Sequence, residues 1–163
     1  MRYITVLKSN GMSDILDDVT RSEPVNLLRN VLALIGGFII GAIVNMGLIE
    51  FGHNRVPVPE EFMQIKTIEA LKEASALLSP KHFVFPFIAH ALGTLVGAYV
   101  CSRIAYSRKR ELALVIGFIF LSGGVSMIIT KGGPHWFKIA DLGFAYIPMA
   151  ILGWSIAVRT SSK

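Results

Sequence analysis

The chain has 163 residues, of which 53% are hydrophobic and only 17% are charged, with a formal net charge of +5. Soluble domains usually carry about 25% charged residues, so this composition indicates a single-domain membrane protein. The basic residues lie beside hydrophobic segments, which indicates membrane topology and not nucleic-acid binding. The single cysteine, Cys101, excludes an internal disulfide and a dithiol redox site.

The first 26 residues mix acidic, basic and polar side chains, and Gly11 and Pro24 interrupt their short apolar pieces. We expect residues 1–26 to form a cytosolic N-terminal tail, with a short surface helix near residues 12–20 that Ser13 caps. Acidic residues precede the first apolar run and no cleavage site follows it, so we do not expect a secretory signal peptide.

Four later segments are apolar and long enough to cross a bilayer, which requires about 20 helical residues. They predict transmembrane spans at about residues 26–49, 83–105, 112–130 and 139–158. Pro86, near the start of the second span, is expected to kink it. The expected fold class is therefore all-α: a polytopic membrane protein whose four-helix transmembrane bundle covers residues 27–159.

Small residues recur every four positions in the first two spans. The first span contains Gly37, Gly41 and Asn45, and the second contains Gly93 and Gly97 on the stripe that also carries His90. Small residues at this spacing let two helix backbones approach closely. We expect the four glycines to be helix-packing positions that face a neighbouring helix.

The connection at residues 50–81 is the longest between spans. Pro57 and Pro59 make its start extended. Residues 67–78 then predict a short external amphipathic helix, because Ile68, Leu71 and Leu78 fall on one side of it. Such a helix would lie on the membrane surface or over the mouth of the bundle.

Basic residues close to the spans predict the orientation. The loop at residues 103–111 contains four Lys or Arg residues and one acid, and Arg29 and Arg159 flank the first and fourth spans on the same side. The positive-inside rule therefore places both termini in the cytoplasm and the 50–81 connection outside.

Residues 32–40 and 112–120 match at six of nine positions, and both begin an outward-going span. Residues 80–83 and 134–137, each of which starts a returning span, also resemble each other. Duplication of one helical hairpin would explain this pattern. Chance similarity between apolar helices explains it equally well.

A polar cluster is the candidate functional site. The helical rise places Asn45, His90 and Tyr146 in the outer half of the bundle, with Glu50 and Asp141 nearer its outer end. Ser122 and Ser126 of the third span fall in the same half. One hypothesis is an ion or solute pathway in which an acid stabilises protonated His90. The alternative is ordinary interhelical hydrogen bonding, worth about 0.6 kcal/mol each, with Glu50 and Asp141 simply solvated.

No motif for catalysis, metal binding or cofactor binding accompanies this cluster. The histidines lack the i,i+4 spacing of a metal site, and the glycine pairs lie inside spans without an adjoining phosphate-binding lysine. We therefore expect a non-enzymatic protein with no metal and no cofactor.

A resemblance to a known protein family covers residues 28–158, and the segments PKHFVFPFIAHALGTLVGAYV and AYIPMA carry most of it. This region resembles a family of small, uncharacterised bacterial four-span integral membrane proteins, which implies the bacterial inner membrane. The first functional hypothesis is an accessory or structural subunit that associates with itself or with other membrane subunits within the lipid bilayer. The alternative is a small oligomeric transporter or channel that uses the polar cluster.

Overall fold

A computed structural model describes the backbone of residues 2–161 and the side chains of residues 25–62 and 64–160. The described residues are mostly helical and contain no strand, which confirms the all-α class. The elements are α1 (Arg2–Arg55), η1 (Glu60–Gln64), α2 (Ile68–Ala76), α3 (Lys81–Ile104), α4 (Lys109–Lys131), α5 (His135–Phe144) and α6 (Ile147–Ser161).

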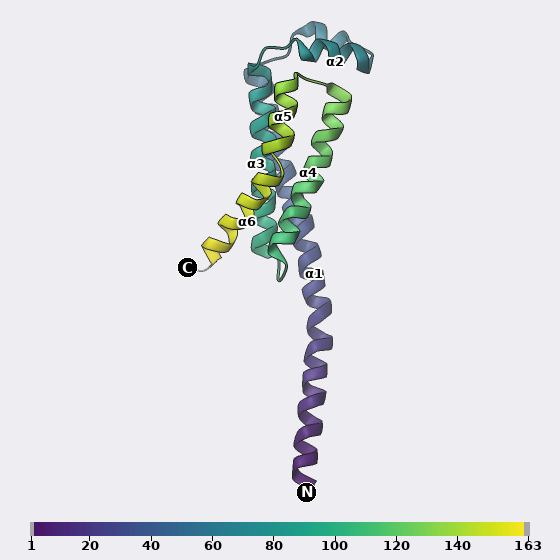
Figure 1. Ribbon diagram of the computed structural model, residues 1–163, viewed down its shortest axis with the longest axis vertical. Helices are drawn as coiled ribbons and strands as arrows, with labels where there is room; N and C mark the ends of the chain where they lie inside the picture. The colour runs from purple at the N-terminus through teal and green to yellow at the C-terminus, as the bar shows by residue number, and fades with distance from the viewer. Residues whose placement is uncertain (1, 162–163) are drawn as a thin grey trace.

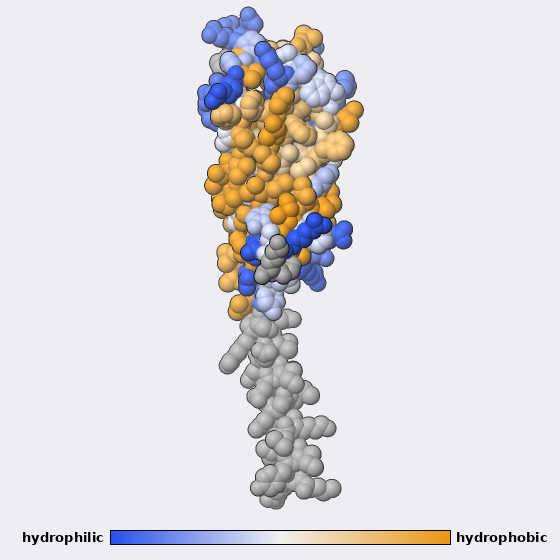
Figure 2. Space-filling view, turned by 90° about the vertical axis from the view of Figure 1, so that its left-hand side faces the viewer, coloured by the Kyte–Doolittle hydropathy of each residue, from blue (hydrophilic) through white to orange (hydrophobic). Residues whose placement is uncertain are grey.

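Four helical segments among the described residues are long and apolar enough to cross a membrane. They are Val25–Arg55, Lys81–Ile104, Lys109–Lys131 and His135–Thr160. Figure 2 shows their hydrophobic side chains as one band between hydrophilic residues at its two ends. This arrangement is that of a multi-pass membrane bundle.

The first helix is longer than the sequence predicts. Its backbone runs without interruption through Gly11 and Pro24 and projects beyond the bundle (Figure 1). Extending an existing helix costs less than nucleating a new one, so the span continues into the polar segment. The expected separate helix at residues 12–20 is therefore wrong, and the side chain of Ser13 lies outside the described residues. At the other end α1 continues to Arg55, and Pro57 follows shortly after.

The glycines of the first two spans lie against one another within the chain. A Cβ atom at Gly41 would lie 2.6 Å from the carbonyl oxygen of Gly93, and one at Gly37 would lie 2.6 Å from that of Gly97. Conversely, a Cβ atom at Gly97 would lie 2.8 Å from the carbonyl oxygen of Gly37. The backbones of α1 and α3 are thus in direct contact, and α3 lies in the centre of the bundle, packed against α1, α4 and α6.

The fourth span is broken, whereas a single helix at residues 139–158 was expected. α5 ends at Phe144 and α6 begins at Ile147 (Figure 1). Pro148 explains the break, because it has no N–H to donate to the carbonyl group of Phe144 four residues earlier. At the second position of α6, by contrast, that N–H is not needed.

The short helix α2 covers the end of the bundle at which α3 begins and α4 ends (Figure 1). Its Ser75 hydroxyl donates to the carbonyl oxygen of Lys131, the last residue of α4, at 2.8 Å. A Cβ atom at Gly132 would lie 2.8 Å from the Cα atom of Lys72, so α2 rests directly on the turn between α4 and α5. Gly132 and Gly133 have φ values of 79° and 122° in this turn, which favour glycine.

At the opposite end of the bundle, α1 holds the loop between α3 and α4. The Asn30 side chain accepts hydrogen bonds from the amides of Tyr106 and Ser107 at 3.0 and 3.3 Å. Arg29 Nε donates to the carbonyl oxygen of Ile104 at 2.7 Å. These polar bonds fix the basic loop against the first span.

The two helical hairpins share one packing feature. Gly37 packs against α3, the returning helix of its own hairpin, and Gly117 packs in the same way against Ala150 of α6. Gly37 and Gly117 are matched positions in the two similar segments. The residues that these two glycines meet on α3 and α6 are not matched positions, so this packing does not distinguish duplication from chance similarity.

Candidate functional site

Three buried polar side chains meet inside the bundle. His90 Nδ1 lies 2.8 Å from Asp141 Oδ1 and 2.9 Å from the Tyr146 hydroxyl oxygen. The Tyr146 hydroxyl donates to Asp141 Oδ2 at 2.7 Å. Asp141 and Tyr146 are each 1% exposed and His90 is 8% exposed. We refer to His90, Asp141 and Tyr146 as the polar triad.

With Asp141 as an ionised carboxylate, the hydrogen bonds of the triad assign the proton on His90. Because the single hydroxyl proton of Tyr146 goes to Asp141, both groups beside Nδ1 are then acceptors. Nδ1 therefore carries a proton and donates it. In neutral His90 the other ring nitrogen, Nε2, then holds a lone pair.

Nε2 of His90 is partly accessible. No hydrogen bond to this atom is present, yet among the described side chains no fully buried nitrogen or oxygen lacks a partner. The accessible 11% of the His90 side chain therefore includes Nε2. His90 also lines a cavity, so this nitrogen is available to a proton or a ligand.

The break in the fourth span positions the triad. Asp141 lies in α5, and Tyr146 lies in the turn that follows, so both side chains reach His90 on α3. Gly124 of α4 supplies the remaining space, because a Cβ atom there would overlap the Tyr146 hydroxyl. The Thr94 hydroxyl donates to the His90 carbonyl oxygen at 2.8 Å, which satisfies the side chain of Thr94 next to the triad.

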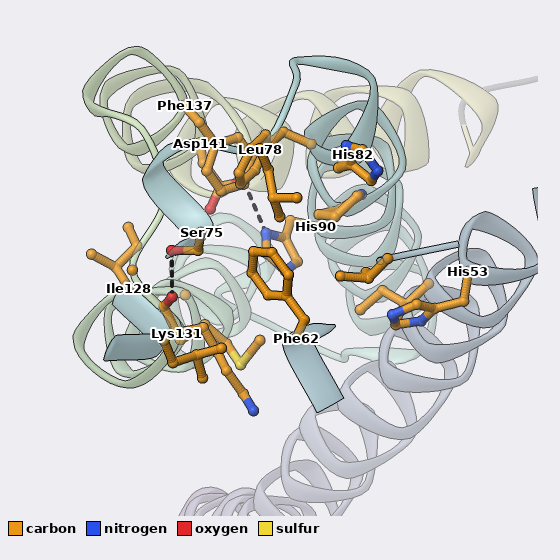
Figure 3. Close-up of a pocket in the computed structure, with 18 of the residues that line it drawn as sticks. His53, Phe62, Ser75, Leu78, His82, His90, Ile128, Lys131, Phe137 and Asp141 are labelled. Carbon is orange, nitrogen blue, oxygen red and sulfur yellow. Dashed lines mark hydrogen bonds and ion pairs between the residues drawn. The ribbon is translucent and has the colours of Figure 1, made fainter. Parts of the chain in front are cut away.

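His90 and Asp141 of the triad lie at the inner end of a cavity of about 650 Å³. The cavity is bounded by the ends of α1 and α4, the starts of α3 and α5, and the segment with η1 and α2 above. In Figure 3 His90 and Asp141 point toward each other, and Ser75 and Lys131 are joined at another side. The apolar lining residues include Ile49, Phe62, Leu71, Leu78, Phe83, Pro86, Met127, Ile128 and Phe137.

The structure brings together only some of the candidate residues. Asp141 is buried and paired, so the expectation that it is simply solvated is wrong; the helix α5 carries it inward, under α2. Glu50 is exposed and lines the cavity near its mouth. Asn45 is half-buried against Gly93 and does not line the cavity. Ser122 and Ser126 are exposed on the outer face of α4, away from the triad.

Sequence reasoning missed several residues of the cavity. Lys131, His82, Phe62 and Phe137 line it, but they come from loops and helix ends whose placement depends on the tertiary structure. The role of Gly124 could have been predicted, because a glycine pair inside a span suggests close approach by a neighbouring group. The incoming group is the hydroxyl of Tyr146.

The chemistry that this geometry permits is proton exchange and hydrogen bonding. Nε2 can accept a proton, and the neighbouring Asp141 carboxylate compensates the resulting positive charge. Among the described residues, no group of three or more His, Cys, Asp or Glu side chains is placed to hold a metal ion.

Comparisons with known proteins add no family to this description. No protein-family model, curated protein or solved structure matches the chain. The resemblance to small bacterial four-span membrane proteins therefore stays a prediction.

Proposed function

We propose that the protein is a small, non-enzymatic membrane transporter or channel that handles protons at the polar triad. The observation that carries this proposal is the buried His90, which is held by Asp141 and Tyr146 through Nδ1, lines a cavity, and has no hydrogen bond at Nε2. Ionisable groups at membrane depth are expensive, and they commonly mark ion pathways.

Depth and charge support this assignment. His90 lies nine residues into α3, or about 13 Å along the helix, so it is well inside the hydrocarbon layer. Protonation at Nε2 gives an imidazolium beside a carboxylate, and the pair is then neutral as a whole. Proton uptake therefore removes the unbalanced charge of Asp141.

The discontinuous fourth span supports the same function. Transporters commonly place their binding sites where a transmembrane helix is interrupted near the middle of the bilayer. Here the interruption at residues 145–146 delivers Tyr146 directly to the triad. A short unwound segment can also change conformation more easily than a continuous helix.

A subunit of a membrane assembly is the second candidate. The glycines that first favoured it, Gly93 and Gly97, already pack against α1. A different face supports association: Ser122, Gly123 and Ser126 are exposed on α4. Extraction from the native membrane in mild detergent, followed by intact-complex mass measurement, tests whether the chain forms a homo-oligomer or joins other subunits.

We further infer a bacterial inner-membrane location with both termini in the cytoplasm. Arg29, Arg103, Arg110 and Arg159 belong to the end of the bundle that carries the α3–α4 loop. Basic residues close to spans are retained on the cytoplasmic side. The cavity then opens toward the outer half of the bilayer.

A pH step tests the proton-handling proposal. Proteoliposomes on a solid-supported membrane are moved from about pH 8 to about pH 5, the range in which histidine changes charge. We expect a current, transient if the proton only binds and sustained if it crosses. His90→Gln should abolish the current, and His82→Gln, which changes a half-exposed histidine bonded to Ser79, should not. No current from the unmodified protein would contradict the proposal.

A further inference from the structure

The cavity beside the triad is mostly apolar and is large enough for an organic molecule. Ligand pockets typically have volumes of about 300–1,000 Å³, with few polar groups, and this cavity falls within that range. Its walls include the rings of Phe62, Phe83 and Phe137. A small hydrated ion does not require apolar walls, whereas an aromatic or aliphatic molecule would fill the cavity and contact them.

Nε2 of neutral His90 is an acceptor at the inner end of this cavity. A ligand that binds it must present an N–H or O–H group. The carboxylate of Asp141 lies on the other side of the imidazole ring, and its charge is uncompensated while His90 is neutral. A ligand with a positively charged N–H donor therefore fits both the hydrogen bond and the charge.

The other titratable groups of the cavity leave this balance unchanged. They are Glu50 and His53 on α1, His82 on α3 and Lys131 on α4. Glu50 and Lys131 are both exposed near the mouth, and their charges offset each other. Asp141 is the buried charge closest to the ligand position, because it contacts His90 directly.

The cavity is reached from the lipid between α1 and α4. These two helices meet where Phe120 lies 5.8 Å from Phe38 between ring centroids and contacts Gly41. Met127, seven residues farther out and thus about 10 Å beyond, lines the cavity and is also 46% exposed. An exposed side chain in a spanning helix faces lipid, so at this level the cavity wall is also lipid-facing surface.

Two other sides of the cavity are bridged by side-chain contacts. Phe83 of α3 and Phe137 of α5 pack with ring centroids 4.8 Å apart. Above them, Ser75 of α2 is bonded to the carbonyl oxygen of Lys131. A molecule dissolved in the membrane therefore meets fewer barriers than one arriving through the covering segment.

From these observations we propose that the solute is a lipophilic amine, which enters from the bilayer between α1 and α4. Its ammonium N–H donates to Nε2 of His90 and takes the place of the proton there. That proton leaves Nε2 for water at the mouth, so one positive charge balances Asp141 before and after the exchange. This inference rests on the proposed proton-handling function and adds to it the class of solute.

Three naphthalene probes test the class of ligand. 1-Naphthylmethylamine, 1-naphthalenemethanol and 1-naphthoate share one body and differ in charge. Binding to the protein in lipid nanodiscs is measured by fluorescence against protein-free nanodiscs. We expect the amine to bind at least about tenfold more tightly than the other two, as a charged hydrogen bond permits, and His90→Gln to remove this preference. Equal binding of the three probes, or a preference for the naphthoate, would overturn the proposal.

A matched pair of variants tests the route. Met127→Trp places a bulky ring at the lipid-facing cavity wall, whereas Val125→Trp places it on exposed α4 surface outside the cavity. We expect only Met127→Trp to slow association of the amine. Equal association rates for both variants would overturn entry between α1 and α4.

The failure of this inference is distinguishable from failure of the proposed function. Calorimetry in two buffers of different ionisation enthalpy should show release of a proton when the amine binds at acidic pH. A pH-step current without amine preference would leave the proton function standing and remove the amine. Amine binding without proton release would overturn the exchange at Nε2.

Discussion

At the scale of single residues, the balance between His90 and Asp141 determines whether the site is stable. Removing a charge from water is expensive, and its partner offsets that cost only while both are present. Asp141 is 1% exposed and accepts from both His90 and Tyr146. The stability of the bundle should therefore depend on the pair as a unit.

We predict that His90→Leu destabilises the protein by about 3–5 kcal/mol, as breaking a buried pair does. The double variant His90→Leu/Asp141→Leu should be clearly more stable than this single variant, because it leaves no buried charge without a partner. Equilibrium unfolding in mixed micelles measures both. Equal destabilisation of the single and double variants would show that the two side chains are not coupled.

Gly124 offers a second test of the triad. We predict that Gly124→Ala destabilises the protein by about 1–3 kcal/mol through overpacking, because its Cβ atom would overlap the Tyr146 hydroxyl. Gly123→Ala is the matched control, since a Cβ atom there has no neighbour within 4 Å. Unfolding midpoints that fall equally for both variants would contradict the role of Gly124.

The sequence allowed these residues to be nominated, with Asp141 or Glu50 as the acid beside His90, but it did not choose between the two acids. His90, Asp141 and Tyr146 stood out because polar groups inside spans need partners. Their contact depends on the break after Phe144, which directs Tyr146 toward α3. An unbroken helix, as expected from hydropathy, places Asp141 near a solvated end, and for this reason its burial was not anticipated.

At the scale of elements, the contact between α1 and α3 is the most extensive in the bundle. Without a hydrophobic force between helices in lipid, close backbone packing is a main source of association. The spacing of Gly37, Gly41, Gly93 and Gly97 predicted a close helix partner. It did not identify that partner, because the same stripe serves equally for association between chains.

We predict that Gly41→Ala lowers stability by about 1–3 kcal/mol, because its Cβ atom would lie 2.6 Å from the Gly93 carbonyl oxygen and 2.9 Å from the Phe120 ring. Gly47→Ala, on the same helix with no neighbour within 4 Å, should leave stability unchanged. Unfolding in mixed micelles gives the comparison. An unaffected Gly41→Ala variant would rule out this packing.

The boundaries of elements were harder to predict than their existence. Hydropathy identified every apolar segment, because a span needs a run of about 20 apolar residues. It could not detect the interruption at residues 145–146, since the residues on both sides are equally apolar. Pro148 was the available signal, because proline inside a helix removes a backbone hydrogen bond.

At the scale of the whole molecule, the basic loop and the covering helix lie at opposite ends. The loop between α3 and α4 is bonded to α1 through Asn30, and α2 is bonded to the end of α4 through Ser75. In the orientation that we propose from the charge rule, the first of these ends is cytoplasmic. The cavity then belongs to the outer half of the membrane.

We predict that a membrane-impermeant maleimide labels Glu61→Cys from outside intact spheroplasts, and labels Tyr106→Cys only after permeabilisation. Both positions are exposed, and the native Cys101 is fully buried, so its background labelling should be low. The reverse pattern would place the termini and the basic loop outside.

The state of the His90 ring connects the three scales, because it depends on Asp141, on the broken helix and on the membrane-embedded cavity. Magic-angle-spinning NMR of ¹⁵N-histidine protein in lipid measures it directly, with His90→Gln to assign the signals. At alkaline pH we predict a proton on Nδ1 and a lone pair on Nε2, and on acidification a second proton on Nε2. A proton on Nε2 with a bare Nδ1, or an Nε2 that takes up no proton at any pH, would contradict the proposed site.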